Sequence, residues 1–332
     1  MRKTLILVVL LMGATIVLMG APVVGMKTIP LKSILSLSTG GIDSDIFWKL
    51  RIPRVLASFL AGIALAVSGM AFQAMFRNPL ATPFTLGVSS GAALGASVYV
   101  RLGWSFSLWT ISGTSIFAFL GAVTSILLLY ALTRARRGFS TATMLLAGVA
   151  ISFFFSSLIM FVQYLSDFTE MFRILRWLMG GIEIAGYHPI LNMMPFVACG
   201  SAIIFLLTHE LNLMTIGEDI ATSRGVDVNR TKKLIFFATS LMVGAVVAVC
   251  GPIGFVGMMS PHICRLLIGY NHRYLVPATI LFGGMFLTLC DTLVRTLIAP
   301  AEMPVGVITA LLGGPFFIWL LLSGSSERRI IR

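Results

Sequence analysis

The chain has little charge for its length. Only 11% of its 332 residues are Asp, Glu, Lys or Arg, whereas 58% are hydrophobic. A soluble domain carries about 25% charged residues, so this chain has less than half the charge that a water-facing surface needs. This scarcity excludes a soluble enzyme, a disordered chain and a nucleic-acid-binding protein, although the net charge is +12. In so apolar a chain, the positive excess indicates basic loops on one side of a membrane.

Residues that bind metals or form disulfides are also scarce. The chain has four cysteines, none in CxxC spacing, and four histidines that are not spaced as metal ligands. Each cysteine lies in an apolar stretch, which is typical of buried small side chains rather than of a metal site or a disulfide. These cysteines are Cys199, Cys250, Cys264 and Cys290. We therefore expect neither a metal nor a cofactor in this chain.

Motifs for nucleotide binding and hydrolysis are absent from the sequence. The segment closest to a Walker A loop, Gly20 to Lys27, has one residue too many before the lysine and no strand ahead of it. His209-Glu210 lacks the second histidine of an HExxH motif. Paired carboxylates and nucleophile–base sets are not visible either. We expect no enzymatic activity from this chain.

Long apolar runs, by contrast, fill most of the sequence. A membrane-spanning helix needs about 20 apolar residues, and breaks rich in charge, proline or glycine separate the runs. They predict one all-α transmembrane domain over residues 1–332, with an uncleaved first span and an even number of spans. The predicted spans lie near 4–25, 55–75, 84–100, 108–132, 141–164, 189–208, 234–250, 257–269, 275–298 and 304–322.

The basic residues test this layout. If the N-terminus is cytoplasmic, 15 of the 24 Lys and Arg residues fall on the cytoplasmic side and nine outside. The bias has the sign that the positive-inside rule requires. We therefore expect both termini in the cytoplasm.

Three polar segments interrupt the apolar runs. The first, 26–54, is expected to be an external loop, and the second, 165–188, to hold a short external helix with Glu170 and Arg173 on one face. The third, 209–233, is expected on the cytoplasmic side. In it, Thr215 as a possible cap, Glu218 three residues later and Gly225 as a stop predict a short amphipathic helix.

One acidic residue, Asp291, lies well inside an apolar run. A membrane-embedded acid is a candidate for function, and Asp291 is the one good feature of a proton-coupled secondary transporter acting without an ATPase. Alternatively, Asp291 is structural, because Arg295 lies one helical turn later and can form an ion pair with it. Because a proton-driven transporter usually has several buried ionisable groups, the sequence favours a transporter powered by another protein.

Four segments of the sequence identify a family. They are 51–56 with 69–81, 86–92, 251–263 with His272-Arg273, and 302–316. In these segments the chain resembles the permease subunits of binding-protein-dependent ABC importers for iron–siderophores, haem and cobalamin. The resemblance implies a BtuC-like fold of about ten helices. It also implies alternating access in a bacterial or archaeal cytoplasmic (inner) membrane.

The resemblance also implies partners and a substrate class. A second permease subunit, most simply an identical copy, would complete the pore, and two ATP-binding subunits would hold ATP and Mg. A soluble extracytoplasmic protein would deliver the ligand, and membrane lipid would surround the helices. The expected substrate is a metal chelate, with a ferric siderophore first and cobalamin or haem next.

Site residues carried over from the family lie at three places, beside which one glycine-rich segment has two interpretations. The binding-protein docking arginines are Arg51, Arg54 and Arg295, for which lipid headgroup anchoring is the alternative. The cytoplasmic gate is Ser140 and Thr141, which alternatively only cap the fifth helix. The glycines of 87–95 serve close helix packing or line the pathway. The ATPase-coupling residues of the 209–233 loop are Gly217, Glu218, Asp219, Ala221, Arg224, Gly225 and Val226.

Overall fold

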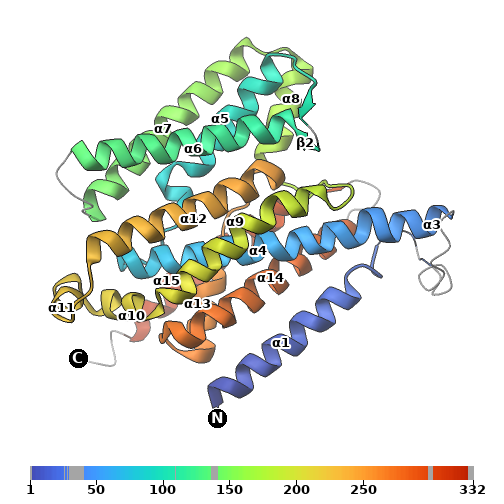
Figure 1. Ribbon diagram of the computed structural model, residues 1–332. Coiled ribbons are helices and arrows are strands. Elements are labelled where there is room, and N and C mark those ends of the chain that lie inside the picture. The colour runs from blue at the N-terminus through green and yellow to red at the C-terminus, as the bar shows by residue number, and fades with distance from the viewer. Residues whose placement is uncertain are drawn as a thin grey trace.

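The computed structural model is a helical bundle in which long apolar helices lie side by side (Figure 1). The structure describes residues 2–25, 27, 29, 41–108, 110–135, 141–297 and 302–327. Its longer elements are α1 (Arg2–Gly20), α4 (Ile52–Phe76), α5 (Val88–Arg101), α6 (Gly113–Ala135), α7 (Thr141–Leu165), α8 (Phe168–Leu178), α9 (His188–Leu206), α12 (Val228–Cys250), α13 (Val256–Ile268), α14 (His272–Leu297) and α15 (Val305–Glu327).

Shorter elements connect these helices. A 3-10 turn, η2 (Pro83–Leu86), precedes α5, and a two-stranded antiparallel hairpin precedes α6. In this hairpin, Ser107 pairs with Ser112. The remaining elements are α3 (Ile42–Asp45), the π-helical turn η1 (Ile46–Arg51), β1 (Ser107–Leu108), β2 (Ile111–Ser112), α10 (Thr208–Ile216) and α11 (Glu218–Ser223).

A helix occupies each of the ten predicted spans, so the all-α membrane fold is confirmed. Among the described residues, seven helical segments are long and apolar enough to cross a membrane. The others, including both spans predicted to be short, are α5, α13 and the apolar part of α15 (Val305–Leu320). An α-helix in lipid satisfies its backbone hydrogen bonds within itself, which explains why long apolar runs become helices here.

The helix boundaries depart from the predictions in two instructive places. Residues 42–51 were expected in an external loop, yet α3 and η1 extend α4 backward through them. Similarly, α12 begins at Val228 rather than 234, because the Asp227 carboxylate caps it and accepts a hydrogen bond from the Arg230 backbone N–H at 3.0 Å. In both places a charged helical extension continues an apolar helix, which hydropathy alone does not detect.

Close backbone contact between helices is concentrated at glycines. Helix α4 packs on α14 and α13, and a Cβ added at Gly62 or Gly69 would overlap the backbone of Gly283 or Gly257. Helix α5 packs on α6 in the same way, with Gly91 against that helix's backbone. Small residues allow such close approach in membranes. The close-packing interpretation of the glycines in 87–95 is therefore confirmed.

The bundle has two ends and two flanks (Figure 1). Helices α5 to α8 form one flank, beside α12, and α1 lies on the opposite side, packed against α14. One end carries α10 and α11 with the starts of α7, α12 and α14, and we call it the α11 end. The other end carries α3, α8 and the start of α4, and we call it the arginine end. Lys3 at the start of α1 lies at the α11 end, with its Nζ 5.3 Å from the centroid of the Tyr274 ring.

Helix α8 forms as expected. Asp167 and Glu170 form a capping box, in which the Glu170 backbone N–H donates to the Asp167 carboxylate at 2.8 Å. Glu170 pairs with Arg101 of α5 at 3.4 Å. Arg176 pairs with Glu183 at 2.7 Å, and this partner raises the pKa of the Arg176 guanidinium. The capping box explains why the helix starts where it does.

Candidate functional site at the two ends of the helix bundle

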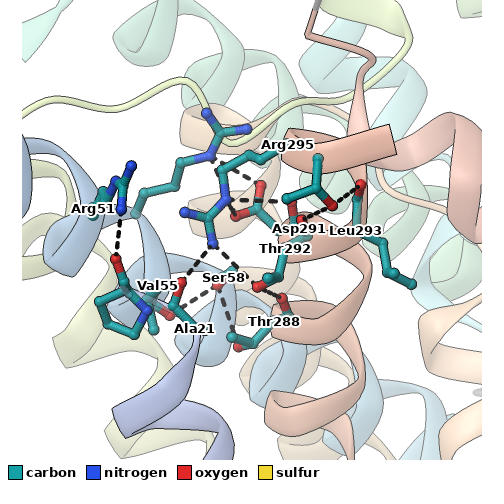
Figure 2. A network of polar contacts seen from close by, with 12 residues as sticks. Ala21, Arg51, Val55, Ser58, Thr288, Asp291, Thr292, Leu293 and Arg295 are labelled. Carbon is teal, nitrogen blue, oxygen red and sulfur yellow. Dashed lines mark hydrogen bonds and ion pairs between the residues drawn. The ribbon is translucent and has the colours of Figure 1, made fainter. Parts of the chain in front are cut away.

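A buried carboxylate organises the arginine end. The side chain of Asp291 on α14 is 0% exposed, and its Oδ2 lies 3.2 Å from Nε of Arg295, one turn later on the same helix. The expected Asp291–Arg295 ion pair is therefore present (Figure 2). The second amino group of Arg295 donates to the Thr292 hydroxyl at 3.1 Å and lies 3.5 Å from the Ala21 carbonyl oxygen. These contacts hold the end of α1 against α14.

Arg54 on α4 is a second partner of the same carboxylate. Its Nε lies 3.0 Å from Asp291 Oδ1, and its Nη1 lies 2.8 Å from Glu302 Oε2. The Arg54 side chain is 13% exposed and that of Glu302 is 41% exposed. Arg54 therefore bridges a buried and a surface carboxylate, and two arginines compensate the charge of Asp291. A carboxylate so paired is a poor candidate for a proton carrier, and the proton-coupled transporter gains no support here.

Arg51, the last residue of η1, has backbone partners instead of carboxylates. Its Nη1 lies 3.2 Å from the carbonyl oxygens of Pro22 and Val23, and its Nη2 donates to the carbonyl of Lys27. Arg51 is only 7% exposed. Its guanidinium thus fixes the segment after α1 against the start of α4. Arg51 and Arg54 lie on one continuous helical segment and Arg295 lies on α14, and all three are at this end.

Hydroxyl groups complete the arginine end, and sequence reasoning did not identify them. The Ser58 hydroxyl of α4 lies 3.2 Å from that of Thr288, and it also donates to the Val55 carbonyl at 2.8 Å (Figure 2). The signal available in the sequence was the i, i+4 spacing of Thr288 and Thr292, whose hydroxyls donate back to the helix carbonyls. These contacts satisfy polar groups in the α4–α14 contact.

At the α11 end, the predicted amphipathic helix is two shorter helices. Thr215 was expected to cap a helix, but it lies inside α10, where its hydroxyl donates to the Asn212 carbonyl at 2.7 Å. The chain breaks at Gly217, and α11 begins with Glu218 and ends before Gly225, which adopts a positive φ of 84°. Glycine tolerates this backbone conformation at a helix end. The prediction of Gly225 as the stop is confirmed.

The residues of α11 and its C-terminal turn separate by exposure. Ala221 is fully buried and Val226 is 9% exposed, so these two attach the segment to the bundle. Asp219 and Arg224 are exposed. Most of α11 other than Ala221 is thus accessible, and Asp219 and Arg224 are its exposed charges.

The inward side of α11 carries an ion pair that the sequence did not indicate. Glu218 Oε2 lies 2.7 Å from Nζ of Lys232 on α12, whose side chain is only 2% exposed. Glu218 Oε1 accepts a hydrogen bond from the Thr141 hydroxyl at 3.4 Å, at the start of α7. The structure therefore brings the expected coupling residue and the expected gate residue together. Ser140, the other expected gate residue, lies outside the described residues.

All four cysteines are free thiols. Cys250, Cys264 and Cys290 are buried as expected, whereas Cys199 on α9 is exposed, contrary to the expectation. An apolar run in a membrane protein faces either protein or lipid, and hydropathy does not distinguish the two. Across the described part of the chain, no three His, Cys, Asp or Glu side chains gather as metal ligands.

Comparison with known proteins now identifies the class. A model of the FecCD transport family matches residues 4–323. The chain belongs to this family of transport permeases, and the resemblance inferred from its motifs is confirmed. Among relatives, it is 36% identical over 328 residues to the hemin transport system permease protein HmuU of Yersinia pestis, covering 98% of each chain.

Further similar proteins are also ABC transporter permeases or ABC transporters. The chain is 40% identical to an uncharacterized ABC transporter permease protein, YvrB, of Bacillus subtilis, covering 85% of this chain and 82% of the relative. It is 39% identical to the vitamin B12 import system permease protein BtuC of Salmonella typhi, with 84% of each covered. A solved inward-facing structure of a putative metal-chelate type ABC transporter is 32% identical with a TM-score of 0.83, covering 94% of this chain and 98% of that one.

Proposed function

We propose that this chain is the membrane permease of an ABC importer that takes up a metal chelate. The observation that carries the proposal is the family match over residues 4–323. It is supported by 36% identity to a hemin permease over 98% of each chain and by 39% identity to a vitamin B12 permease over 84% of each chain. Haem, cobalamin and ferric siderophores are the candidate substrates. The chain translocates rather than catalyses, and separate subunits bind ATP and Mg and hydrolyse the nucleotide.

The partners follow from the architecture of such importers. A second permease subunit, most simply an identical copy, forms the pore with this chain in the cytoplasmic membrane. Helices α7 and α15 have apolar surface that such a subunit could cover, with large exposed side chains such as Leu146 at 74% and Leu311 at 63% exposure. Surface of this kind is covered either by a second subunit or by membrane lipid.

The two polar ends are assigned to two soluble partners. The α11 end faces the cytoplasm with both termini, and the exposed residues of α11 receive the ATPase. The arginine end faces outward and receives the substrate-binding protein, through carboxylate pairs that guide encounter. Of the three expected docking arginines, Arg54 is the most accessible, and Arg51 and Arg295 hold the surface beneath it. Transport then proceeds by alternating access as the ATPases close and open.

Uptake by whole cells tests the proposal. Cells with and without the gene are given labelled ferric siderophore, haem and cobalamin in parallel, and we expect uptake of one of them to depend on the gene. That uptake should persist when a protonophore collapses the proton gradient while ATP is maintained, and it should stop when ATP is depleted. Uptake that instead follows the proton gradient would establish the proton-coupled alternative.

A further inference from the structure

The ion pair between Glu218 and Lys232 is unusual in its burial. Lysine is almost never fully buried unless it is paired, and the Lys232 side chain is 2% exposed. Taking an ammonium group out of water is costly, and a close carboxylate with good geometry offsets much of that cost. The Glu218 carboxylate, 2.7 Å away, therefore has a fixed position relative to α12.

The same carboxylate reaches a third element. While one oxygen accepts from Lys232 on α12, the other accepts from the Thr141 hydroxyl at the first residue of α7, 3.4 Å away. The Glu218 backbone itself begins α11. One side chain thus joins α11, α12 and α7 at the α11 end of the bundle.

The exposure of α11 shows which face is available to a partner. Asp219 and Ile220, directly after Glu218, are exposed, as are the following residues 222–225. Glu218 and Ala221 make the contacts with the bundle, although the Glu218 side chain is itself 36% exposed. A protein that binds the exposed residues of α11 can therefore move the helix while the Glu218 carboxylate stays on Lys232.

We propose that Glu218 is a positioning residue that transmits displacement of α11 to the start of α7. This inference rests on the proposed function, in which the ATPase moves α11. Because the carboxylate is held by Lys232, any shift of α11 changes its contacts with α12 and α7 together. The 3.4 Å contact with Thr141 is longer than the 2.7 Å ion pair and is the weaker of the two. It is the contact that breaks and reforms as α7 moves.

This role differs from that of an ATPase contact. A residue that binds the ATPase would lose affinity for it when changed. A residue that transmits motion leaves the ATPase bound and hydrolysing, but lowers the amount of substrate moved per ATP. The ratio of transport to hydrolysis is therefore the readout that separates the two roles.

The test uses the whole complex in proteoliposomes. Glu218→Gln keeps the shape of the side chain and removes its charge, and Thr141→Val removes the hydroxyl. We expect each variant to retain the ATPase subunits and to hydrolyse ATP within about twofold of the wild type. Transport of radiolabelled haem, or of whichever chelate the uptake assay identifies, should fall at least tenfold per ATP hydrolysed.

Two further variants protect the test against misfolding. Glu218→Gln removes the carboxylate that lies beside the buried Lys232 ammonium group, which is destabilising, whereas replacing both members of the ion pair removes the two charges together. The double variant Glu218→Gln with Lys232→Met should therefore fold stably but still transport poorly per ATP. Arg230→Met, at an exposed position on the same helix α12, is the matched control and should behave like the wild type.

The outcomes separate the two proposals. If the stable double variant and Thr141→Val both couple hydrolysis to transport normally, Glu218 is only a structural residue and the inference is wrong. If the wild-type chain transports without ATPase subunits, the proposed function itself is wrong. Variants of Glu218 and Thr141 combined should be no worse than either one alone, because both interrupt the same contact.

Discussion

Arg54 and Asp291 are 237 residues apart in the sequence, but the arginine Nε lies 3.0 Å from the carboxylate Oδ1. Their pair joins α4 to α14 at the arginine end. Arg295 binds the other carboxylate oxygen at 3.2 Å. One fully buried negative charge thus holds two cations and a helix–helix contact together.

Removing the Asp291 charge should destabilise the chain strongly. Asp291→Asn leaves the guanidinium groups of Arg54 and Arg295 facing each other without the charge between them. Breaking a buried ion pair by removing one partner costs about 3–5 kcal/mol. We expect the free energy of unfolding in detergent to fall by about that amount, measured by chemical denaturation.

The matched control is an exposed pair of the same chemistry. Asp45 on α3 lies 2.7 Å from Lys49, with the two side chains 56% and 69% exposed. An exposed pair contributes about 0.2–1 kcal/mol, so Asp45→Asn should barely change the unfolding curve. Equal effects of the two substitutions would show that Asp291 is not the organising charge.

Glycine packing gives a second stability prediction. A Cβ on Gly69 of α4 would overlap the backbone of Gly257 in α13, so Gly69→Val forces the two segments apart. Overpacking a tight contact costs about 1–3 kcal/mol and sometimes more. We expect a lower melting temperature and a lower folded yield after membrane extraction. Gly20→Ala, which has open space around its Cβ, should match the wild type in both measurements.

Much of this fold could be predicted from the sequence, because apolar runs bounded by charge determine where membrane helices form. The pairing of Asp291 with Arg295 was also predictable, since an i, i+4 spacing places both on one helix face. The convergence of Arg54 with Asp291 was not, because nothing local in the sequence records which helices pack together. The carbonyl partners of Arg51 were invisible for the same reason.

Lys232 illustrates a second limit. Hydropathy placed it in a polar loop, where a lysine is expected to be solvated. The Asp227 cap starts α12 six residues before the predicted start at 234, and the helix then turns Lys232 inward toward Glu218. From the sequence alone, a buried lysine in such a polar helical extension cannot be distinguished from an exposed one. Only the packing of α11 on α12 distinguishes them.

The outward face of α11 leads to a prediction about the ATPase. Arg224 ends the helix and is exposed, so Arg224→Glu reverses a charge on the proposed docking surface. Charge reversal across an interface disfavours the original partner. We expect the ATPase subunits to co-purify with this variant at least tenfold less than with the wild type. If these subunits are fully retained, the exposed residues of α11 are not the surface that binds the ATPase.

The last prediction concerns Glu302, which competes for the proposed docking arginine. Glu302 is 41% exposed and binds Nη1 of Arg54 at 2.8 Å, so it occupies the donor that an incoming carboxylate would use. Glu302→Gln should weaken that internal contact and strengthen binding of the substrate-binding protein severalfold at low salt. Arg54→Glu should slow the association at least tenfold, because like charges then oppose encounter. The binding strength and the association rate are both measured by surface plasmon resonance, with the binding protein added to the reconstituted permease.

Salt dependence and one matched variant decide how that result is interpreted. Exposed charge pairs are screened by salt, so the difference between Arg54→Glu and the wild type should shrink as ionic strength rises. Arg101, also at the arginine end and paired with Glu170 at 3.4 Å, is not a proposed docking residue. Arg101→Glu should therefore leave the association rate nearly unchanged. If Arg101→Glu slows association as much as Arg54→Glu does, the binding protein responds to the general charge of this end rather than to Arg54.

If Glu302→Gln weakens binding instead, Glu302 orients the arginine for docking rather than competing for it.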